Sequence, residues 1–256
     1  MMLLPLLFSW EEVTGRWIWN DVEVIRVYRE GEREDGVSLP WLEFIDRKTG
    51  RVLMKTYRYG EGMSATLIDS VLIMDFDGDG VDEILLTFSW LGSAGYESTY
   101  IMERRGDGVE VVFHEETHSL DTIMDMDGDG DLELVMSGGT FFVMTCNACK
   151  PVYYLVYAYS NGRWRCSRQL TMDYNLRHAN GNYEFSPSDS VIGGYMSLRD
   201  LQRVAFLLYG GRMGEARRFF LSRWRGDGAE EGWRRLMEDV ESDRVLRCIY
   251  PQRRER

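Results

Sequence analysis

Two short acidic loops carry the residues of this sequence with the clearest capacity for chemistry. The first loop runs from Asp75 to Glu83 and the second from Asp125 to Glu133. Each loop has carboxylates at its first, third, fifth and ninth positions and a glycine at its sixth. Calcium binds about six to eight oxygen atoms, and acids at alternate positions of a tight loop converge on one point. The glycine permits the sharp turn that lets the seventh carbonyl face inward. The spacing therefore predicts two calcium sites.

The charge distribution favours cations bound at these loops over a generally acidic surface. The 256 residues include 42 Asp and Glu against 30 Lys and Arg, which gives a net charge of −12. Ten of the acids lie in the two loops, so the other 32 nearly balance the basic residues. This balance argues against a nucleic-acid partner. No apolar run reaches the roughly 18 residues of a membrane helix, so we also expect no membrane span.

The loops do not fit an EF-hand, although the first half of each loop is similar. An EF-hand needs a bidentate Glu at its twelfth position and a helix on each side. The twelfth positions here are Leu86 and Met136. The flanking residues have the composition of strands rather than helices. Dockerin-like loops are excluded by the same missing acid.

Both loops resemble the calcium loop of FG-GAP and VCBS repeats, in which D-x-D-x-D-G-x-x-[D/E] joins two strands of a propeller blade. Such repeats occur in integrin α-subunit propellers and in many bacterial surface proteins. The resemblance implies two calcium ions with a structural role, each locking two strands together. It implies the ligands Asp75, Asp77, Asp79, the Val81 carbonyl and Glu83 in the first loop, and Asp125, Asp127, Asp129, the Asp131 carbonyl and Glu133 in the second.

The elements that must position the loops repeat along the chain. Three hairpins, each with a glycine-containing turn, are predicted at 41–57, 98–114 and 153–168. In the second and third units another strand pair flanks the acidic loop, at 70–74 with 83–90 and at 121–124 with 133–137. The first unit has only a remnant at this place, Trp19-Asn20-Asp21-Val22-Glu23, which we do not expect to hold a cation.

This organisation predicts a mainly β fold for residues 9–170, with about three propeller-like units of about four antiparallel strands each. A period near 55 residues with four strands per unit is typical of propeller blades. Three units are too few to close a ring of the usual size. The repeats therefore form an open fan, gain edge cover from the helices that follow, or oligomerise.

The C-terminal part of the sequence changes from strand to helix periodicity. Residues 171–195 are polar and turn-rich and predict a linker, and residues 196–250 predict a helical region. Its apolar stripes include Leu198, Leu201, Val204 and Leu208, then Ala216, Phe220 and Trp224, then Trp233, Leu236 and Val240. Such helices either cover the edge of the β-sheet or form a helical-repeat surface that binds a partner while the β part serves as scaffold.

A second candidate metal motif competes with the calcium loops. His114-Glu115-x-x-His118 matches the zinc-peptidase pattern, in which two imidazoles one helical turn apart bind zinc and the Glu acts as general base. This alternative requires a helix across residues 108–120. The Val-rich residues before His114 favour a strand followed by a loop, which is the expectation we adopt.

The four cysteines permit disulfides without defining them. Cys146 and Cys149 form a C-x-x-C pair, and Cys166 follows at a short distance in sequence. The alternatives are a disulfide within the loop, a bridge from Cys166 to Cys146 or Cys149, or a local metal site. Cys248 is the fourth cysteine and lies in the helical region.

These observations predict a non-catalytic, calcium-binding structural or interaction module. Calcium loops of extracellular type bind with dissociation constants of roughly 10⁻⁴–10⁻³ M, so they suit an extracytoplasmic setting: periplasmic, secreted or at the cell surface. The apolar segment Met1–Phe8 is either the remnant of a signal peptide or a first strand. Four tyrosines, Tyr153, Tyr154, Tyr157 and Tyr159, form a glycan-facing surface or ordinary sheet packing, and the partner is an unidentified protein or glycan.

Overall fold

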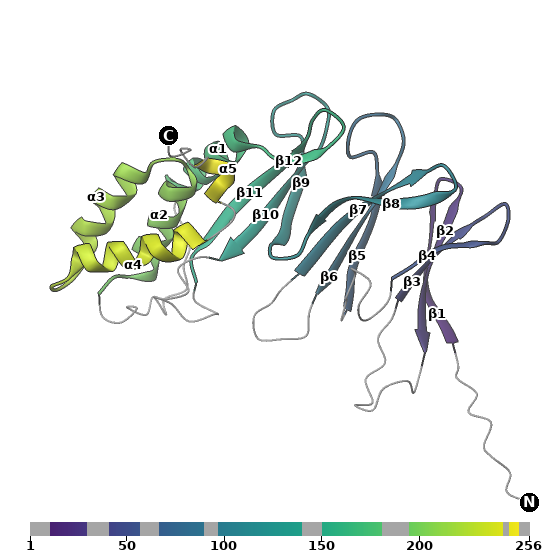
Figure 1. Cartoon of the computed structure of the whole chain (residues 1–256), viewed down its shortest axis with the longest axis horizontal. Coiled ribbons are helices and arrows are strands. Elements are labelled where there is room, and N and C mark those ends of the chain that lie inside the picture. The colour runs from purple at the N-terminus through teal and green to yellow at the C-terminus, as the bar shows by residue number, and fades with distance from the viewer. Residues whose placement is uncertain are drawn as a thin grey trace, which may run out of the picture. The chain divides into compact units, whose positions relative to one another are not determined.

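The protein is mainly β, with helices in its C-terminal part. The computed structural model describes residues 11–29, 41–56, 67–89, 97–139, 150–180, 195–242 and 246–250 (Figure 1). The described residues contain three four-stranded antiparallel sheets. In each sheet, strands that are consecutive in sequence are neighbours. The mainly β prediction with C-terminal helices is therefore confirmed.

Each sheet is a simple meander of four strands. The first contains β1 (Glu11–Trp19), β2 (Val22–Arg29), β3 (Trp41–Asp46) and β4 (Val52–Lys55). The second contains β5 (Leu67–Met74), β6 (Glu83–Ser89), β7 (Glu97–Arg105) and β8 (Gly108–Glu115). The third contains β9 (Ser119–Met124), β10 (Glu133–Gly139), β11 (Val152–Tyr159) and β12 (Trp164–Cys166). The three predicted hairpins correspond to β3–β4, β7–β8 and β11–β12.

The chain divides into two compact units, Met1–Thr117 and His118–Arg256. The first unit holds the first two sheets, and the second unit holds the third sheet with the helices. The division falls inside the predicted repeat region 9–170, because β11 packs against helices rather than only against strands.

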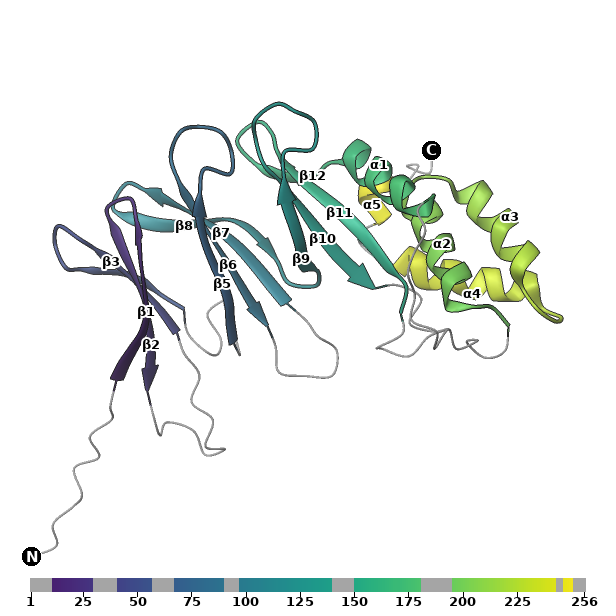
Figure 2. The ribbon, with the colours of Figure 1, turned by 180° about the vertical axis from the view of Figure 1, so that it is seen from behind.

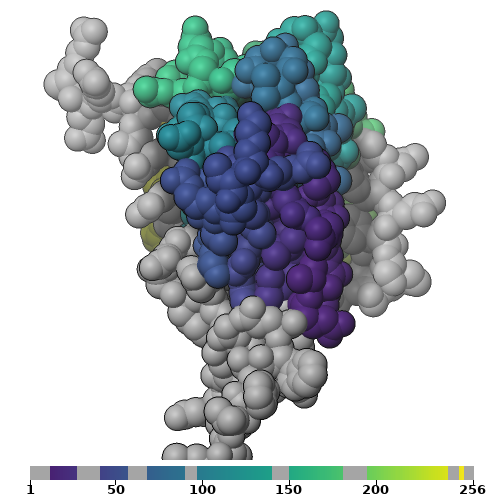
Figure 3. Space-filling model, turned by 90° about the vertical axis from the view of Figure 1, so that its right-hand side faces the viewer, coloured from purple at the N-terminus to yellow at the C-terminus, as the bar shows by residue number. Residues whose placement is uncertain are grey.

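In the first unit the core lies between the two sheets. Side chains on alternate positions of the strands meet there and exclude water, as expected for half-buried strands. Trp19 and Phe44 from the first sheet and Phe88 and Tyr100 from the second are among its large members. Their rings meet edge to face, with centroids 6.1 Å apart for Trp19–Phe44 and 5.6 Å for Phe88–Tyr100. Strands β1–β4, purple to blue, form one continuous layer in the space-filling view (Figure 3).

One arginine joins the turns of these two sheets. The Arg104 guanidinium of β7 donates to Asp21 Oδ1 and Asp46 Oδ2 of the first sheet, each at 3.2 Å, and to the Gly108 carbonyl at 2.8 Å. Only 12% of the Arg104 side chain is exposed. A planar guanidinium can serve three acceptors at once, so Arg104 places a fixed cation between two carboxylates.

In the second unit, helices pack against the third sheet. They are α1 (Arg168–Ala179), α2 (Leu198–Tyr209), α3 (Met213–Arg223), α4 (Ala229–Ser242) and α5 (Leu246–Ile249). Figures 1 and 2 both show α1 and α2 beside the end of β11. The apolar stripes predicted for the C-terminal region are buried, for example Leu201, Phe220 and Leu236. None of the described helices has both the length and the apolar character needed to cross a membrane.

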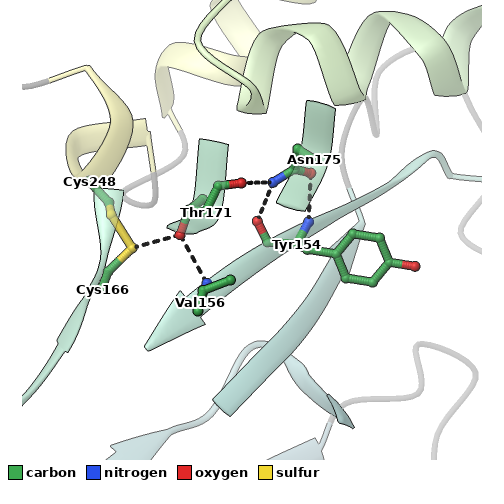
Figure 4. The surroundings of a disulfide bond; sticks show 6 residues. All are labelled: Tyr154, Val156, Cys166, Thr171, Asn175 and Cys248. Carbon is green, nitrogen blue, oxygen red and sulfur yellow. Dashed lines mark hydrogen bonds between the residues drawn. A yellow bond between two sulfur atoms is a disulfide. The ribbon is translucent and has the colours of Figure 1, made fainter. Parts of the chain in front are cut away.

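The helices complete the outer edge of β11 with side chains. Strand β12 pairs with β11 only from Tyr157 onward. Before that point the main-chain groups of Val152, Tyr154 and Val156 bond to Gln202, Asn175 and Thr171, as Figure 4 shows for the last two pairs. Gln202 and Asn175 each donate to and accept from one strand residue, as a neighbouring strand would.

Two predictions for this part of the chain need correction. Helix α1 occupies the start of the predicted linker 171–195, because Thr171 and Asn175 are buried against the strand edge rather than solvated. Cys166 is bonded to Cys248, which ties β12 to α5 (Figure 4), so the predicted bridges from Cys166 to Cys146 or Cys149 are wrong. Cys146, Cys149 and the segment Met1–Phe8 lie outside the described residues.

Candidate metal centre

The first acidic loop joins β5 to β6 and is folded around its own carboxylates. Gly80 N–H donates to Asp75 Oδ2 at 2.9 Å, Asp79 N–H to Asp77 Oδ1 at 3.2 Å, and Val81 N–H to Asp79 Oδ1 at 2.8 Å. Gly80 has φ of +88°, a left-handed conformation that favours glycine. The glycine at the sixth position therefore permits the sharp turn that was predicted for it.

Four carboxylates of this loop gather around one point. Asp75, Asp77, Asp79 and Glu83 each offer an oxygen atom, and these four atoms lie within 4.8 Å of one another. Glu83 is the first residue of β6 and is 3% exposed. Its Oε2 accepts a hydrogen bond from the buried Phe76 N–H at 2.8 Å. The strand therefore places one ligand at the base of the loop, and the loop supplies the other three.

Asp75 has one oxygen without a hydrogen-bond partner. Its Oδ2 accepts from Gly80, whereas its Oδ1 is buried and accepts no hydrogen bond from the protein. A buried carboxylate oxygen without a partner is costly, because its hydration is lost and nothing replaces it. A cation at the convergence point of the loop would supply that partner, so the residues present fit a bound hard cation.

The electrostatics of Glu83 point in the same direction. The pKa of Glu83 is raised to about 7. Burial is the largest cause, the hydrogen bond from the Phe76 N–H lowers the pKa, and the nearby Asp77, Asp75 and Asp79 raise it. The raised pKa means that the charged form of Glu83, which is buried and close to three other carboxylates, is unfavourable without a counter-ion. A divalent cation would reverse this balance.

The second loop, between β9 and β10, repeats most of this arrangement. Glu133 is 1% exposed, and its Oε2 accepts from Met126 N–H at 2.6 Å. Burial also raises the pKa of Glu133. Oxygen atoms of Asp125, Asp127 and Glu133 lie within 4.8 Å of one another. In both loops the acid at the ninth position, which begins a strand, accepts a hydrogen bond from the N–H of the second loop residue. The two loops therefore share this local conformation.

Three predicted ligands are not among the grouped carboxylates: the Asp129 side chain and the carbonyls of Val81 and Asp131. Asp129 is not part of the second group, and its Oδ1 accepts from Asp131 N–H at 3.0 Å. Val81 and Asp131 were expected to act through their carbonyls. The Val81 side chain is 49% exposed, which is consistent with a main-chain role.

The zinc motif does not have the helical context that it requires. His114 and Glu115 lie in strand β8, and His118 follows after a bend. The His114 ring stacks on Tyr100 with centroids 4.2 Å apart. His118 is buried, and its Nε2 lies 2.7 Å from the Tyr153 hydroxyl. Both imidazoles therefore pack on tyrosines: His114 on Tyr100 of the neighbouring strand β7, and His118 on Tyr153 of β11.

Two of the tyrosines considered for a glycan surface, Tyr153 and Tyr154, pack against helices of the second unit. Tyr153 is 3% exposed and stacks on Tyr209 of α2, with ring centroids 3.8 Å apart. Tyr154 packs edge to face on Tyr174 of α1. Ordinary packing accounts for both residues.

Sequence reasoning missed three features around the site. They are the Arg104 bridge, the amide pairing of β11, and two hydrogen bonds from Trp19 and Asn20 to the Asp82 carbonyl in the first loop. The segment Trp19–Glu23 was predicted only as a remnant that holds no cation, and nothing in the sequence indicated its hydrogen bonds to Asp82.

Comparison with family models and with curated protein sequences finds no match for this chain.

Proposed function

We propose that the protein is a non-catalytic calcium-binding module, in which each acidic loop holds one calcium ion that locks two strands of a propeller-like unit. The observation that carries the proposal is the convergence of four carboxylates in the first loop, one of which, Asp75, has a buried oxygen without a hydrogen-bond partner. The ligands would be Asp75, Asp77, Asp79, the Val81 carbonyl and Glu83. In the second loop they would be Asp125, Asp127, Asp129, the Asp131 carbonyl and Glu133.

The chemistry of the donors favours calcium over zinc. All of the gathered atoms are oxygens, which suit hard cations, whereas zinc sites in proteins use sulfur and nitrogen ligands more often. The flanking strands and the loop spacing support the resemblance to FG-GAP and VCBS repeats. Calcium would neutralise each loop and stabilise the folded state by about 2.7 kcal/mol at a hundredfold excess over its dissociation constant.

The disulfide supports an extracytoplasmic location. Cys166–Cys248 joins residues 82 positions apart. Such bonds persist in oxidising compartments and are rare in the cytosol of most cells. Millimolar calcium is available in the same compartments, so the two features agree.

The helical region serves, in this proposal, as the cap of the third sheet. Gln202, Asn175 and Thr171 occupy hydrogen-bonding groups of β11 that a fourth full-length strand would otherwise use. This arrangement supports edge cover over the alternative of a free-standing partner-binding helical repeat.

Native mass spectrometry with metal identification, on protein purified without chelator, tests the proposal. We expect two calcium ions, one lost in Asp75→Ala and both lost in Asp75→Ala/Asp125→Ala. Asp82→Asn is the matched control, because it removes a charge from the first loop without removing a proposed ligand side chain. One zinc ion that disappears in His118→Ala would overturn the proposal.

A further inference from the structure

The first metal loop is hydrogen-bonded to the neighbouring sheet at one main-chain carbonyl. The Asp82 carbonyl accepts from the Trp19 indole Nε1 at 2.6 Å and from Asn20 Nδ2 at 2.9 Å. Trp19 is the last residue of β1 and Asn20 begins the turn to β2, so both donors lie more than sixty positions earlier in the chain. Two consecutive residues of the first sheet thus share one acceptor in the second.

Asp82 lies between two proposed calcium ligands. The Val81 carbonyl belongs to the peptide group before it, and the Glu83 carboxylate belongs to the residue after it. The Glu83 side chain is itself held by the Phe76 N–H. Fixing the Asp82 carbonyl restricts rotation of the main chain on both sides, and a ligand that is already oriented loses less freedom when the ion binds.

The two donors are themselves held in place. Trp19 is fully buried in the core between the sheets, where its ring meets Phe44 edge to face. Asn20 has φ of +52°, a left-handed conformation that asparagine adopts more readily than most residues. The position of the Asp82 carbonyl is therefore set by how the first sheet packs on the second.

We propose that Trp19 and Asn20 are positioning residues for the first calcium site, and that calcium bound there strengthens the packing of sheet β1–β4 on sheet β5–β8. The inference rests on the proposed calcium-binding function. Coupling free energies are reciprocal, so donors that favour calcium binding are held more firmly by the same factor once calcium is bound. Residues at the place where the first unit has only a remnant of the acidic pattern thus contact the acidic loop of the second sheet.

Calcium titration of full-length protein by calorimetry tests the positioning role. Asp125→Asn disables the second loop, so the titration reports on the first loop. Asp75→Asn disables the first loop, so the titration reports on the second. In the first background, Asn20→Gly keeps the left-handed backbone and removes the amide. We expect it to weaken calcium binding about 3- to 10-fold, the worth of one hydrogen bond. In the second background the same change leaves the dissociation constant within about twofold, as expected for a site that Asn20 does not contact.

Trp19→Phe provides a second variant that keeps a buried aromatic ring and removes the N–H donor. Circular dichroism checks its fold, and a 3- to 10-fold weakening confined to loop one is again expected. An unchanged dissociation constant in both variants, or an equal change in both loops, overturns the inference and leaves the proposed function standing. If the Asp125→Asn protein binds no calcium at all, the proposed function fails, and the inference fails with it.

Hydrogen–deuterium exchange tests the reciprocal effect on packing. In the wild-type protein, calcium is expected to slow exchange of the amides in β1 and β2, although no ligand comes from these strands. In Asn20→Gly and Trp19→Phe this slowing is expected to be lost or reduced severalfold, while slowing in the first loop itself persists at saturating calcium. Equal slowing of β1 and β2 in the variants and in the wild type would contradict the coupling.

Discussion

Asn175 of α1 pairs with the main chain of Tyr154 in β11 through two hydrogen bonds, one donated and one accepted, at 2.8 and 3.1 Å. The side-chain amide has the same donor and acceptor as a peptide group, so it can take the place of a strand residue. Asn175 also donates to the Thr171 carbonyl one turn earlier in its helix and is fully buried. Helix α1 is thereby fixed to the sheet by polar pairing as well as by apolar contact.

Asn175→Ala is expected to destabilise the protein by about 2–3 kcal/mol, because it leaves the Tyr154 N–H and carbonyl buried without partners. Urea denaturation followed by circular dichroism measures the change in the free energy of unfolding. Gln169→Ala on the same helix is the control, since that side chain is exposed, and it should stay within about 0.5 kcal/mol of the wild type. Equal effects of the two substitutions would show that the pairing with β11 contributes nothing specific.

Arg104→Met is expected to destabilise the first unit by about 1–3 kcal/mol, because it leaves Asp46 and Asp21 close together without their shared cation. Arg104→Lys retains the charge but cannot serve three acceptors, so an intermediate loss is expected. Arg105→Met, at an exposed neighbouring position, provides the control. Thermal unfolding of the four proteins at one pH gives the comparison. A loss in Arg104→Lys as large as in Arg104→Met would mean that geometry rather than charge makes the contribution.

Local patterns predicted the hairpins and the acidic loops because the determinants are local. Alternating apolar residues, turn glycines and carboxylate spacing act within about ten residues of one another, and in both loops the structure places the ninth acid at the start of a strand. Asp129 is the exception among the spaced carboxylates, since it lies outside the group that Asp125, Asp127 and Glu133 form. Spacing alone does not determine which loop carboxylates face inward together.

The features that escaped prediction depend on partners distant in sequence. Helix α1 has a polar composition typical of a linker, yet its buried Thr171 and Asn175 are satisfied by the main chain of β11. Composition does not distinguish a polar residue in water from one that is paired at a strand edge. The Cys166–Cys248 bond likewise joins residues 82 positions apart, and its selection required the helices to bring them together.

Removal of this disulfide in the variant Cys166→Ala/Cys248→Ala is expected to cost about 2–5 kcal/mol of stability, since the bond closes a long loop and limits the unfolded chain. The measurement is urea denaturation under non-reducing conditions, so that the oxidation state of the remaining cysteines is the same in both proteins. The variant should still bind two calcium ions, because neither cysteine lies near the acidic loops in sequence. Loss of calcium together with the disulfide would contradict the separation of the two roles.

The pKa of Glu83 predicts an unusual dependence of stability on pH in calcium-free protein. Its folded-state pKa of about 7 lies above the ordinary value of 4.5. Between these values the folded protein keeps a proton that the unfolded chain releases, so the contribution of Glu83 to the free energy of unfolding falls as pH rises from about 4.5 to 7. Below this window both states are protonated and the contribution is constant.

Glu83→Gln removes this titration and keeps a side chain of the same size, so the variant isolates the effect. In the presence of chelator, the stability of the wild type relative to Glu83→Gln is expected to fall by about 3 kcal/mol between pH 4.5 and 7.5, given about 1.4 kcal/mol for each pKa unit. In the wild type, the calcium affinity of the first loop is expected to rise through the same pH window, because calcium displaces the proton of Glu83. In Glu83→Gln, the first loop is expected to bind calcium weakly at every pH. A difference that stays constant from pH 4.5 to 7.5 would show that Glu83 ionises normally and that burial does not hold its proton.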